Sequence, residues 1–265
     1  MTSALSTATP TVTLTAGAKM PLIGFGTHPL RGQEATEAIL QALDLGYRSV
    51  DTATRYQNQD AVGAALRQTS IPREELFITT KLPPDAVGFE RKTLEQSLEA
   101  LGSDYVDLWL MHWPPGGSPG VGSWKEFIRA REEGLVRAIG VSNYQIRLLD
   151  ALKRETGEYP EVTQLQWSPV CYSERYLTAC RERGIVVGAH SPLRSARLED
   201  PVLTEIAKAH DVTPTQVIIR WDVQHGVAVV PKSAHRERML SNLDVMRFTL
   251  TEDEMKAIDG LSELE

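Results

Sequence analysis

The sequence predicts an α/β protein, a single (β/α)8 TIM barrel that occupies residues 1–265, and three observations lead to this fold class. The chain has 265 residues, and such a barrel needs about 250. Short apolar or β-branched runs alternate with amphipathic stretches, and no low-complexity linker divides the chain. Near-continuous apolar runs are typical of parallel strands covered on both faces. Their repeated alternation with helices favours a closed barrel over an open sheet.

The strands are predicted in chain order, beginning with a separate hairpin. Thr11–Thr15 and Lys19–Leu22 flank an Ala-Gly-Ala turn and predict a β-hairpin at the floor of the barrel. The longest gap between strands precedes the last one, and Pro201–His210 is expected to form an extra helix there. The predicted barrel strands are Leu22–Gly26, Ser49–Asp51, Leu76–Lys81, Val106–His112, Ala138–Asn143, Val162–Trp167, Ile185–His190 and Val227–Lys232.

Helices are predicted between these strands from apolar spacing and stop signals. Glu34–Leu45, Phe89–Leu101 and Trp124–Glu133 are each followed by a glycine, the favoured residue just past a helix end. Thr213 precedes a proline, which predicts an N-cap followed by proline at the first helical position.

Composition limits the class of partner. The net charge of -7 argues against nucleic acid, whose binding depends on a positive field. Cys171 and Cys180 form no disulfide framework and are expected to be packing residues. No apolar run approaches the roughly 20 residues that span a bilayer, and the first dozen residues read as a frayed tail and do not resemble a signal peptide. We expect a cytoplasmic monomer that acts on a small molecule.

Polar side chains stand at the ends of the apolar strands. In a barrel the carboxyl ends of the strands face the active site, so Asp51, Lys81 and His112, from three consecutive strands, should converge at one mouth. Other polar residues at or near strand ends are Thr27, Asn143, Gln164, His190 and Lys232.

Each of these residues has a simpler interpretation when taken alone. Asp51 could cap the following helix, and Lys81 could extend its ammonium to water. His112 could be a hydrogen-bonded core histidine, and Tyr56, five residues past Asp51, could be an aromatic lid. Their position at neighbouring strand ends favours a shared catalytic role.

Together the four residues predict a proton relay. A buried lysine needs a counter-charge, which Asp51 can supply. A positive Lys81 beside a phenol should lower the pKa of Tyr56 from about 10 toward working pH. Tyr56 could then donate its proton to a carbonyl oxygen, with His112 orienting that oxygen. The hydride must come from elsewhere, and Pro29 breaks the glycine fingerprint of a Rossmann dinucleotide site, so a dinucleotide would have to bind at the barrel mouth.

At this point the chain resembles the aldo-keto reductases over nearly its whole length, and among them the compact prokaryotic type similar to diketogluconate reductases. The matching motifs are Gly24-Phe25-Gly26-Thr27, Asp51-Thr52-Ala53 with Tyr56, Lys81 after a strand, His112-Trp113-Pro114, Gly140-Val141-Ser142-Asn143, and Val230-Pro231-Lys232-Ser233 with Arg238. The resemblance implies reversible NADPH-dependent reduction of aldehydes or ketones to alcohols. It assigns catalysis to Asp51, Tyr56, Lys81 and His112, with Tyr56 as the acid.

The resemblance also implies a cofactor site for NADPH or NADP+. Ser142, Asn143 and Gln164 would bind the carboxamide of the nicotinamide. Lys232, Ser233 and Arg238 would hold the 2′-phosphate, and two cations with a hydroxyl suit a dianion. The remaining cofactor contacts would be Gly26, Thr27, His190, Ser191, Leu193 and Asn242.

The substrate pocket that the resemblance implies is formed by His28, Tyr56, His112 and Trp113. His28 stands where a tryptophan is common, and His190 stands where the family usually stacks an aromatic ring on the nicotinamide. An imidazole offers less stacking area, so the affinity for the cofactor could be weaker or dependent on pH.

Two other functions remain open at this stage. A metal-dependent barrel hydrolase could use Asp51, His28, His112 and His190, but the first strand lacks a His-x-His pair and Lys81 would repel a dication. We therefore predict no metal. An NADPH-binding sensor without turnover is the second alternative, and the complete catalytic set argues against it.

Overall fold

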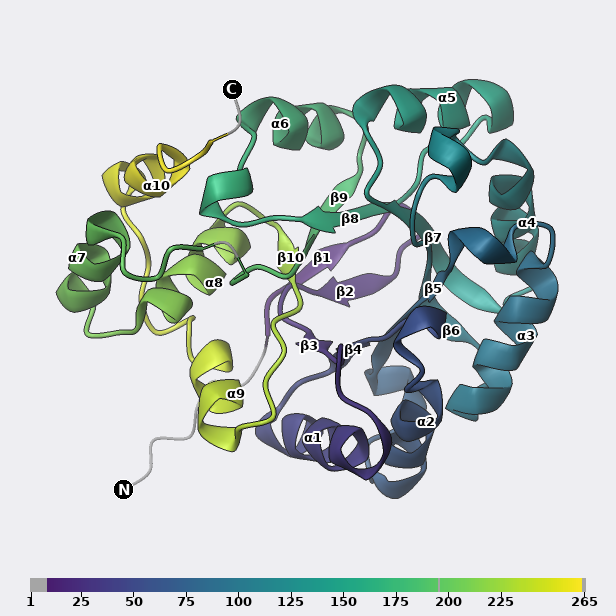
Figure 1. The fold of residues 1–265 in the computed structure, drawn as a ribbon, viewed down its shortest axis with the longest axis horizontal. Coiled ribbons are helices and arrows are strands. Elements are labelled where there is room, and N and C mark those ends of the chain that lie inside the picture. Colours follow the sequence, from purple (N-terminus) through teal and green to yellow (C-terminus); the bar gives the residue numbers. More distant parts are fainter. Residues whose placement is uncertain (1–8, 195, 264–265) are drawn as a thin grey trace.

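The computed structural model describes residues 9–194 and 196–263, where parallel strands curl into a ring enclosed by helices (Figure 1). Each strand pairs in parallel with the next along the chain, which confirms the predicted (β/α)8 fold class. The strands are β3 (Phe25–Gly26), β4 (Ser49–Asp51), β5 (Phe77–Leu82), β6 (Val106–Met111), β7 (Val136–Ser142), β8 (Val162–Gln166), β9 (Val186–His190) and β10 (Ala228–Val229).

The barrel closes where its first and last strands meet, and both are shorter than predicted. Val229 N donates to Leu22 O and Gly24 N donates to Val229 O, each at 2.8 Å. A Cβ on Gly26 would lie 2.5 Å from the carbonyl oxygen of Val230, so only glycine allows the two backbones to approach this closely. The seam is therefore held by a few isolated bonds instead of a long ladder.

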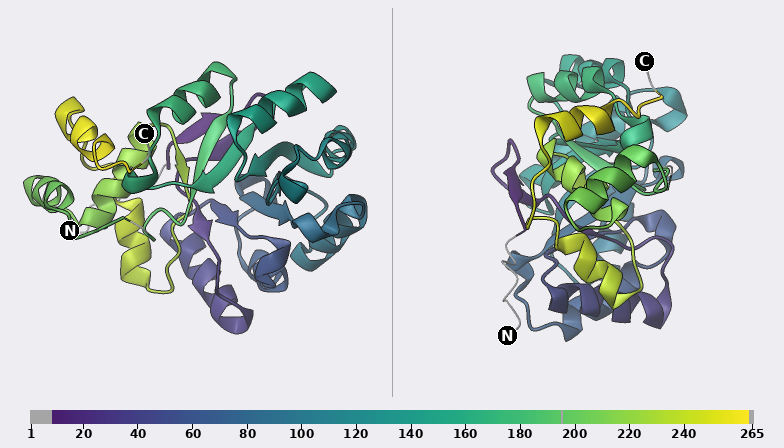
Figure 2. Two further views of the ribbon diagram at one scale, coloured as in Figure 1. Left: turned by 45° about the horizontal axis from the view of Figure 1, so that its top comes forward. Right: turned by 90° about the vertical axis from the view of Figure 1, so that its left-hand side faces the viewer.

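The predicted hairpin is present and covers the floor of the barrel. Its strands, β1 (Thr11–Thr13) and β2 (Lys19–Pro21), pair antiparallel and stand out from one face of the molecule (Figure 2, right). Ala16 N in the turn donates to the buried carboxylate of Glu161 at 2.8 Å. Met20 is buried and reaches the interior from this side. The hairpin therefore both closes and fills the barrel.

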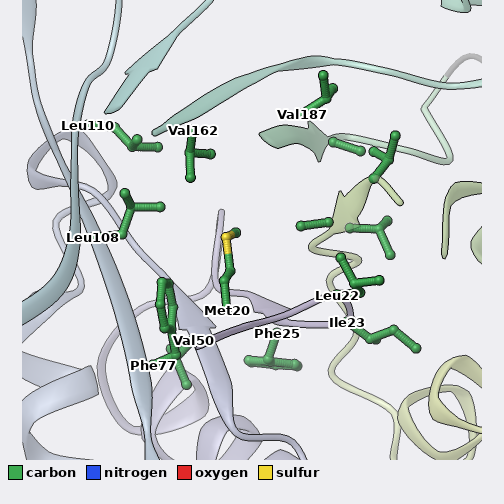
Figure 3. Close-up of a cluster of buried hydrophobic side chains, with 14 of the residues drawn as sticks. Met20, Leu22, Ile23, Phe25, Val50, Phe77, Leu108, Leu110, Val162 and Val187 are labelled. Atoms are coloured by element: carbon green, nitrogen blue, oxygen red, sulfur yellow. The ribbon is translucent and has the colours of Figure 1, made fainter. Parts of the chain in front are cut away.

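Side chains of the strands fill the interior, as expected for a packed core without an open pore. Leu108 and Val162 point toward Met20 (Figure 3). Among the described residues no helix is long and apolar enough to cross a membrane. Residues 1–8 of the predicted N-terminal tail lie outside the described residues, and Thr11 and Val12 belong to β1.

Helices cover the outer face of the sheet (Figure 1). The three helices predicted before Gly46, Gly102 and Gly134 are present within three residues of their expected bounds. Thr213 forms a complete capping box at the start of α8. The helices are α1 (Gly32–Leu45), α2 (Gln59–Gln68), α3 (Glu90–Leu101), α4 (Val121–Glu132), α5 (Ile146–Thr156), α6 (Glu174–Glu182), the predicted extra helix α7 (Pro201–Ala209), α8 (Pro214–Gln224), α9 (Arg236–Leu243) and α10 (Glu252–Asp259).

Candidate active site

A buried ion pair lies at the carboxyl ends of β4 and β5. Asp51 is in register with Thr79, and residues two apart on a strand point to the same face, so Lys81 reaches across to Asp51. Lys81 Nζ lies 2.5 Å from Asp51 Oδ1 and also donates to the carbonyl oxygen of Thr52 at 2.9 Å. Both side chains are at most 5% exposed. Desolvation of each charge is therefore offset by a close opposite charge and further hydrogen bonds.

The same ammonium reaches the hydroxyl of Tyr56. Tyr56 ends a short 3-10 turn, Thr54–Tyr56, that follows β4. Lys81 Nζ donates to Tyr56 Oη at 3.3 Å and lies 4.9 Å from the centre of its ring. The hydroxyl of Thr54 donates to the carbonyl oxygen of Lys81 at 3.0 Å, which fastens the turn to β5. One cation therefore contacts both a carboxylate and a phenol.

Two imidazole rings flank the phenol. The ring centre of His112, which follows β6, lies 5.8 Å from that of Tyr56 with the planes at 80°. The ring centre of His28 lies 4.9 Å away on the loop after β3. Nδ1 of His112 is buried and has no hydrogen-bond partner within the described part of the chain. The phenol ring of Tyr56 and the imidazole ring of His112 are therefore direct neighbours.

Burial and the charges of neighbouring groups together set the pKa values of these residues. It raises the pKa of Tyr56 above the ordinary value of 10, and the attraction of Lys81 only partly offsets this. The expectation that Lys81 would bring the pKa of Tyr56 toward working pH is therefore wrong for the protein alone. Burial, with Lys81 second, lowers the pKa of His112 to about 3. Burial also disfavours the charged form of Lys81, but Asp51 and Tyr56 more than compensate and raise its pKa.

A second group of amides lies beside the ion pair. Gln164 Nε2 donates to Asp51 Oδ2 at 2.8 Å, and Gln164 Oε1 is buried without a hydrogen-bond partner among the described residues. Asn143 has a positive φ of 64°, and its amide donates to His112 O at 3.1 Å and to Ser142 Oγ at 3.0 Å. The predicted carboxamide-binding residues are thus neighbours of the predicted catalytic residues.

His190 joins this group from the end of β9. Its Nε2 lies 3.2 Å from Asn143 Oδ1 and its Nδ1 lies 3.3 Å from Ser191 Oγ. Burial, followed by the charge of Lys81, lowers its pKa to about 4. The ring is therefore neutral at physiological pH, and a change of its charge would affect binding only under acidic conditions.

A cavity of about 470 Å³ lies at the mouth of the barrel, and of the groups described above Asp51, Tyr56, His112, His28 and His190 line it, whereas Lys81, Asn143 and Gln164 do not. Thr27 lines it but uses its hydroxyl to donate to Asp51 O at 2.9 Å. The cavity is lined by Gly26, Thr27, His28, Asp51, Tyr56, His112, Trp113, His190, Ser191, Pro192, Leu193, Arg194, Val230, Pro231 and Lys232.

The remaining predicted cofactor residues follow β10 outside this lining. Ser233 is buried, and its hydroxyl accepts from His235 N at 3.0 Å. Arg238 is exposed on α9, and Asn242 on the same helix is buried and hydrogen-bonds the side chain of Tyr47. The structure therefore places these residues on one segment after β10.

Comparison with known proteins places this chain in a family. Residues 22–263 match the model of the Aldo/keto reductase family. The chain belongs to this family. It is 46% identical to an aldo-keto reductase of Mycolicibacterium vanbaalenii, over 99% of this chain and 95% of the relative. It is 42% identical to 2,5-diketo-D-gluconic acid reductase B of a Corynebacterium species, over 95% and 93% of the two chains.

A solved structure agrees with the fold of this aldo-keto reductase. The Bombyx mori aldo-keto reductase in complex with NADP superposes with a TM-score of 0.89 at 31% identity, over 96% of this chain and 93% of that one. The chain described here is thus an oxidoreductase with the family's barrel.

Sequence reasoning missed a residue that supports the site of this reductase. Asn58 is fully buried; its Oδ1 accepts from Thr52 Oγ1 at 2.6 Å, and its Nδ2 donates to Leu30 O at 2.9 Å. It thereby ties the loop after β3 to the turn that carries Tyr56. An asparagine just before a helix signals an N-cap, but no cap bond forms at α2. No local signal identified its real role.

A larger cavity of about 820 Å³ lies at the opposite end of the reductase, between the hairpin and the amino ends of the strands. Charged residues line it, and the buried Asp107 among them binds Arg73 and Arg137 at 2.7 and 3.2 Å. The predicted catalytic residues therefore line the smaller of these two cavities. Within residues 9–194 and 196–263, no three His, Cys, Asp or Glu side chains form a group that could hold a metal ion.

Proposed function

We propose that this reductase uses NADPH to reduce aldehydes or ketones to alcohols, with Tyr56 as the proton donor. One observation carries the proposal: the buried ammonium of Lys81 contacts Asp51 and the hydroxyl of Tyr56 at once. An ammonium in that place stabilises a phenolate and so helps the phenol to release its proton at the moment of reaction.

The residues beside the ion pair fit a nicotinamide cofactor. The unpartnered oxygen of Gln164 is an acceptor that suits the amide N–H of a carboxamide, and a buried acceptor gains most from such a partner. Asn143 and Ser142 lie on the same side, and His190 supplies a ring for stacking. When bound, NADPH supplies the hydride. The structural relative from Bombyx mori, solved in complex with NADP, supports this choice of cofactor.

The raised pKa of Tyr56 keeps its proton in place throughout the neutral range. A neutral His112 has one N–H with which to orient the carbonyl oxygen. As negative charge builds on that oxygen, Tyr56 donates its proton, and Lys81 stabilises the phenolate that remains. Asp51 keeps Lys81 charged and positioned. Because the pKa of His112 is about 3, we expect no change of rate between pH 6 and 8 from this histidine.

We prefer NADPH over NADH because cations lie where the 2′-phosphate, which only NADPH carries, would bind. Lys232 lines the cavity, and Arg238 is exposed on the segment after β10. Replacing Arg238 by alanine should weaken NADPH binding about tenfold, the usual effect of losing a hydrogen bond to a charged group. NADH affinity should change much less. Equal losses for the two cofactors, measured by fluorescence titration, would rule out contact with the 2′-phosphate.

Turnover is the direct test of the proposed function. NADPH oxidation is followed at steady state with a panel of aldehydes, ketones and diketones. Reduction of at least one carbonyl class is expected. Tight NADPH binding without turnover across the panel would instead support a sensor. We further propose that the protein acts as a cytoplasmic monomer on small molecules, and its net charge of -7 argues against nucleic acid as a partner.

A further inference from the structure

The charges around the catalytic cavity are mostly positive, although the chain carries a net charge of -7. The charged groups that act on the ring of His28 are the cations Arg31, Lys81, Lys232 and Arg194. The carboxylate of Asp51 also lines this cavity but is paired with Lys81, so the remaining charge that the lining contributes, from Arg194 and Lys232, is positive. Such a field attracts anions and raises their local concentration.

Part of this positive charge lies on the side proposed for the cofactor. Lys232 and Arg194 follow β10 and β9 and line the cavity there. Arg55 lies elsewhere, on the turn after β4, directly before Tyr56. Its charge acts on His112, the other residue that we place at the carbonyl oxygen. Arg55 is thus the cation nearest in sequence to the proton donor and outside the proposed phosphate site.

The neighbouring histidines cannot supply that charge. Burial, reinforced by the surrounding cations, lowers the pKa values of His28 and His112, so both rings are neutral at physiological pH. The ammonium of Lys81 is already paired with Asp51, so recognition of an anion next to Tyr56 falls to a guanidinium.

The guanidinium of Arg55 is held only weakly by its ion-pair partner. Its Nη2 lies 3.3 Å from Asp85 Oδ2, with the two side chains 51% and 70% exposed. Asp85 belongs to the short turn Pro84–Ala86 after β5, so the pair joins two neighbouring loops at the mouth. An exposed pair of this kind contributes little to stability. A guanidinium binds a carboxylate best through two parallel hydrogen bonds, so a better-placed carboxylate can replace Asp85.

We propose that Arg55 selects carbonyl substrates that carry a carboxylate, and that Asp85 competes with the substrate for its guanidinium. This inference rests on the proposed function, because it names the class of substrate that the same site prefers. The reaction itself is unchanged: the carbonyl carbon gains a hydride and its oxygen gains a proton, while the carboxylate stays intact.

The test compares 4-carboxybenzaldehyde with 4-carbamoylbenzaldehyde, which has nearly the same shape but no charge. The measured quantity is the ratio of their kcat/KM values with NADPH. Wild type should prefer the acid. In Arg55→Gln the ratio should fall about tenfold, as expected for loss of a charge-assisted contact. Arg55→Lys keeps the charge but cannot form the two parallel hydrogen bonds of a guanidinium, so its ratio should be intermediate.

Two further variants check the role of charge. In Asp85→Asn the competing carboxylate is gone, and the ratio should rise about threefold if the exposed pair has the modest strength typical of its class. Arg129→Gln is the matched control, because Arg129 is exposed on α4 and pairs with Glu126. It changes the net charge equally and should leave the ratio unchanged.

The outcomes separate this inference from the proposed function. An unchanged ratio in Arg55→Gln, or an equal fall in Arg129→Gln, overturns the assignment of Arg55. Reduction of both aldehydes by wild type without preference overturns the substrate class but leaves the reductase activity established. Failure to reduce either aldehyde, together with failure across the carbonyl panel, overturns the proposed function and this inference with it.

Discussion

The two ends of the barrel each contain a buried carboxylate bound to cations, yet the cations are used differently. At the floor, Asp107 accepts from Ile78 N at 2.9 Å and pairs with Arg73 and Arg137, which are 22% and 44% exposed. At the mouth, Asp51 pairs with Lys81, which is 1% exposed. The floor pairs reach solvent, whereas the mouth pair is sealed from it.

Each end also places a tyrosine near the cations. The guanidinium groups of Arg73 and Arg137 lie over the ring of Tyr105, 4.2 and 4.1 Å from its centre. At the mouth the ammonium of Lys81 reaches the hydroxyl of Tyr56 instead. Cations over a ring add packing and attraction, but only a cation at the hydroxyl acts on its proton. We therefore propose that the barrel uses similar groups for stability at one end and for catalysis at the other.

Among changes to the buried ion pairs, the largest effect is expected from removing the mouth cation. Lys81→Met should lower kcat by about 10³-fold, within the range for loss of assistance to a general acid. It should also reduce stability by about 3 to 5 kcal/mol, because Asp51 is left buried without a cation. Arg137→Met at the floor is the matched control and should keep kcat within about twofold. A loss of kcat in Arg137→Met as large as in Lys81→Met would contradict the division between the two ends.

Removing the carboxylate at the floor should lower stability without lowering turnover. Asp107→Asn removes the charge to which two guanidinium groups are bonded, and unfolding free energy should fall by about 2 kcal/mol. Turnover should remain near that of wild type, since the substitution lies at the end of the barrel away from the site. Urea unfolding and steady-state rates on the same preparation test both parts, and a loss of turnover without a loss of stability would refute them.

A third buried carboxylate, that of Asp222, contrasts with the two carboxylates that are paired with cations. Asp222 on α8 is fully buried, and both its oxygens lack hydrogen-bond partners within the described ranges. Burial raises its pKa well above the ordinary value. The folded protein therefore keeps a proton that the unfolded chain loses near pH 3.9. Linkage gives the direction of the pH dependence. The stability that this retained proton contributes is fully present below the pKa of the unfolded chain and is lost as pH rises through the pKa of the folded protein.

The smallest effect is expected from neutralising this residue. Asp222→Asn removes the pH-dependent cost, so the variant should gain stability over wild type as pH rises, by about 1 to 3 kcal/mol at pH 8. The gain should shrink toward pH 4.5. Urea midpoints at the two pH values provide the comparison, and parallel pH dependence of the two proteins would show that Asp222 is not the group responsible.

The sequence was sufficient to predict how the site is assembled. Asp51, Lys81 and His112 each follow an apolar run, and parallel strands bring their carboxyl ends to one mouth whatever the exact strand lengths are. The need of a buried lysine for a counter-charge predicted the contact with Asp51, which the structure shows at 2.5 Å. These inferences depend on topology and on the chemistry of residue types, both of which local sequence carries.

Other features depend on packing that no local pattern reports. The pKa of Tyr56 follows from burial of its hydroxyl by loops after β3 and β6, and this burial outweighs the cation. Asp222 lies in a helix stretch that is buried on every side, so helical spacing gave no warning of it. The partnership of Arg55 with Asp85 joins two loops whose approach only the folded chain defines.

The central claim is that Tyr56 delivers the proton, and one variant tests it most directly. In Tyr56→Phe, NADPH oxidation in a single turnover with a reactive aldehyde should slow by about 10²- to 10⁴-fold. The Kd of NADPH, titrated on the same protein, should stay within about twofold of wild type, because we assign the hydroxyl to the reacting oxygen. A variant that transfers hydride at a nearly normal rate would contradict the account and place the proton donor elsewhere.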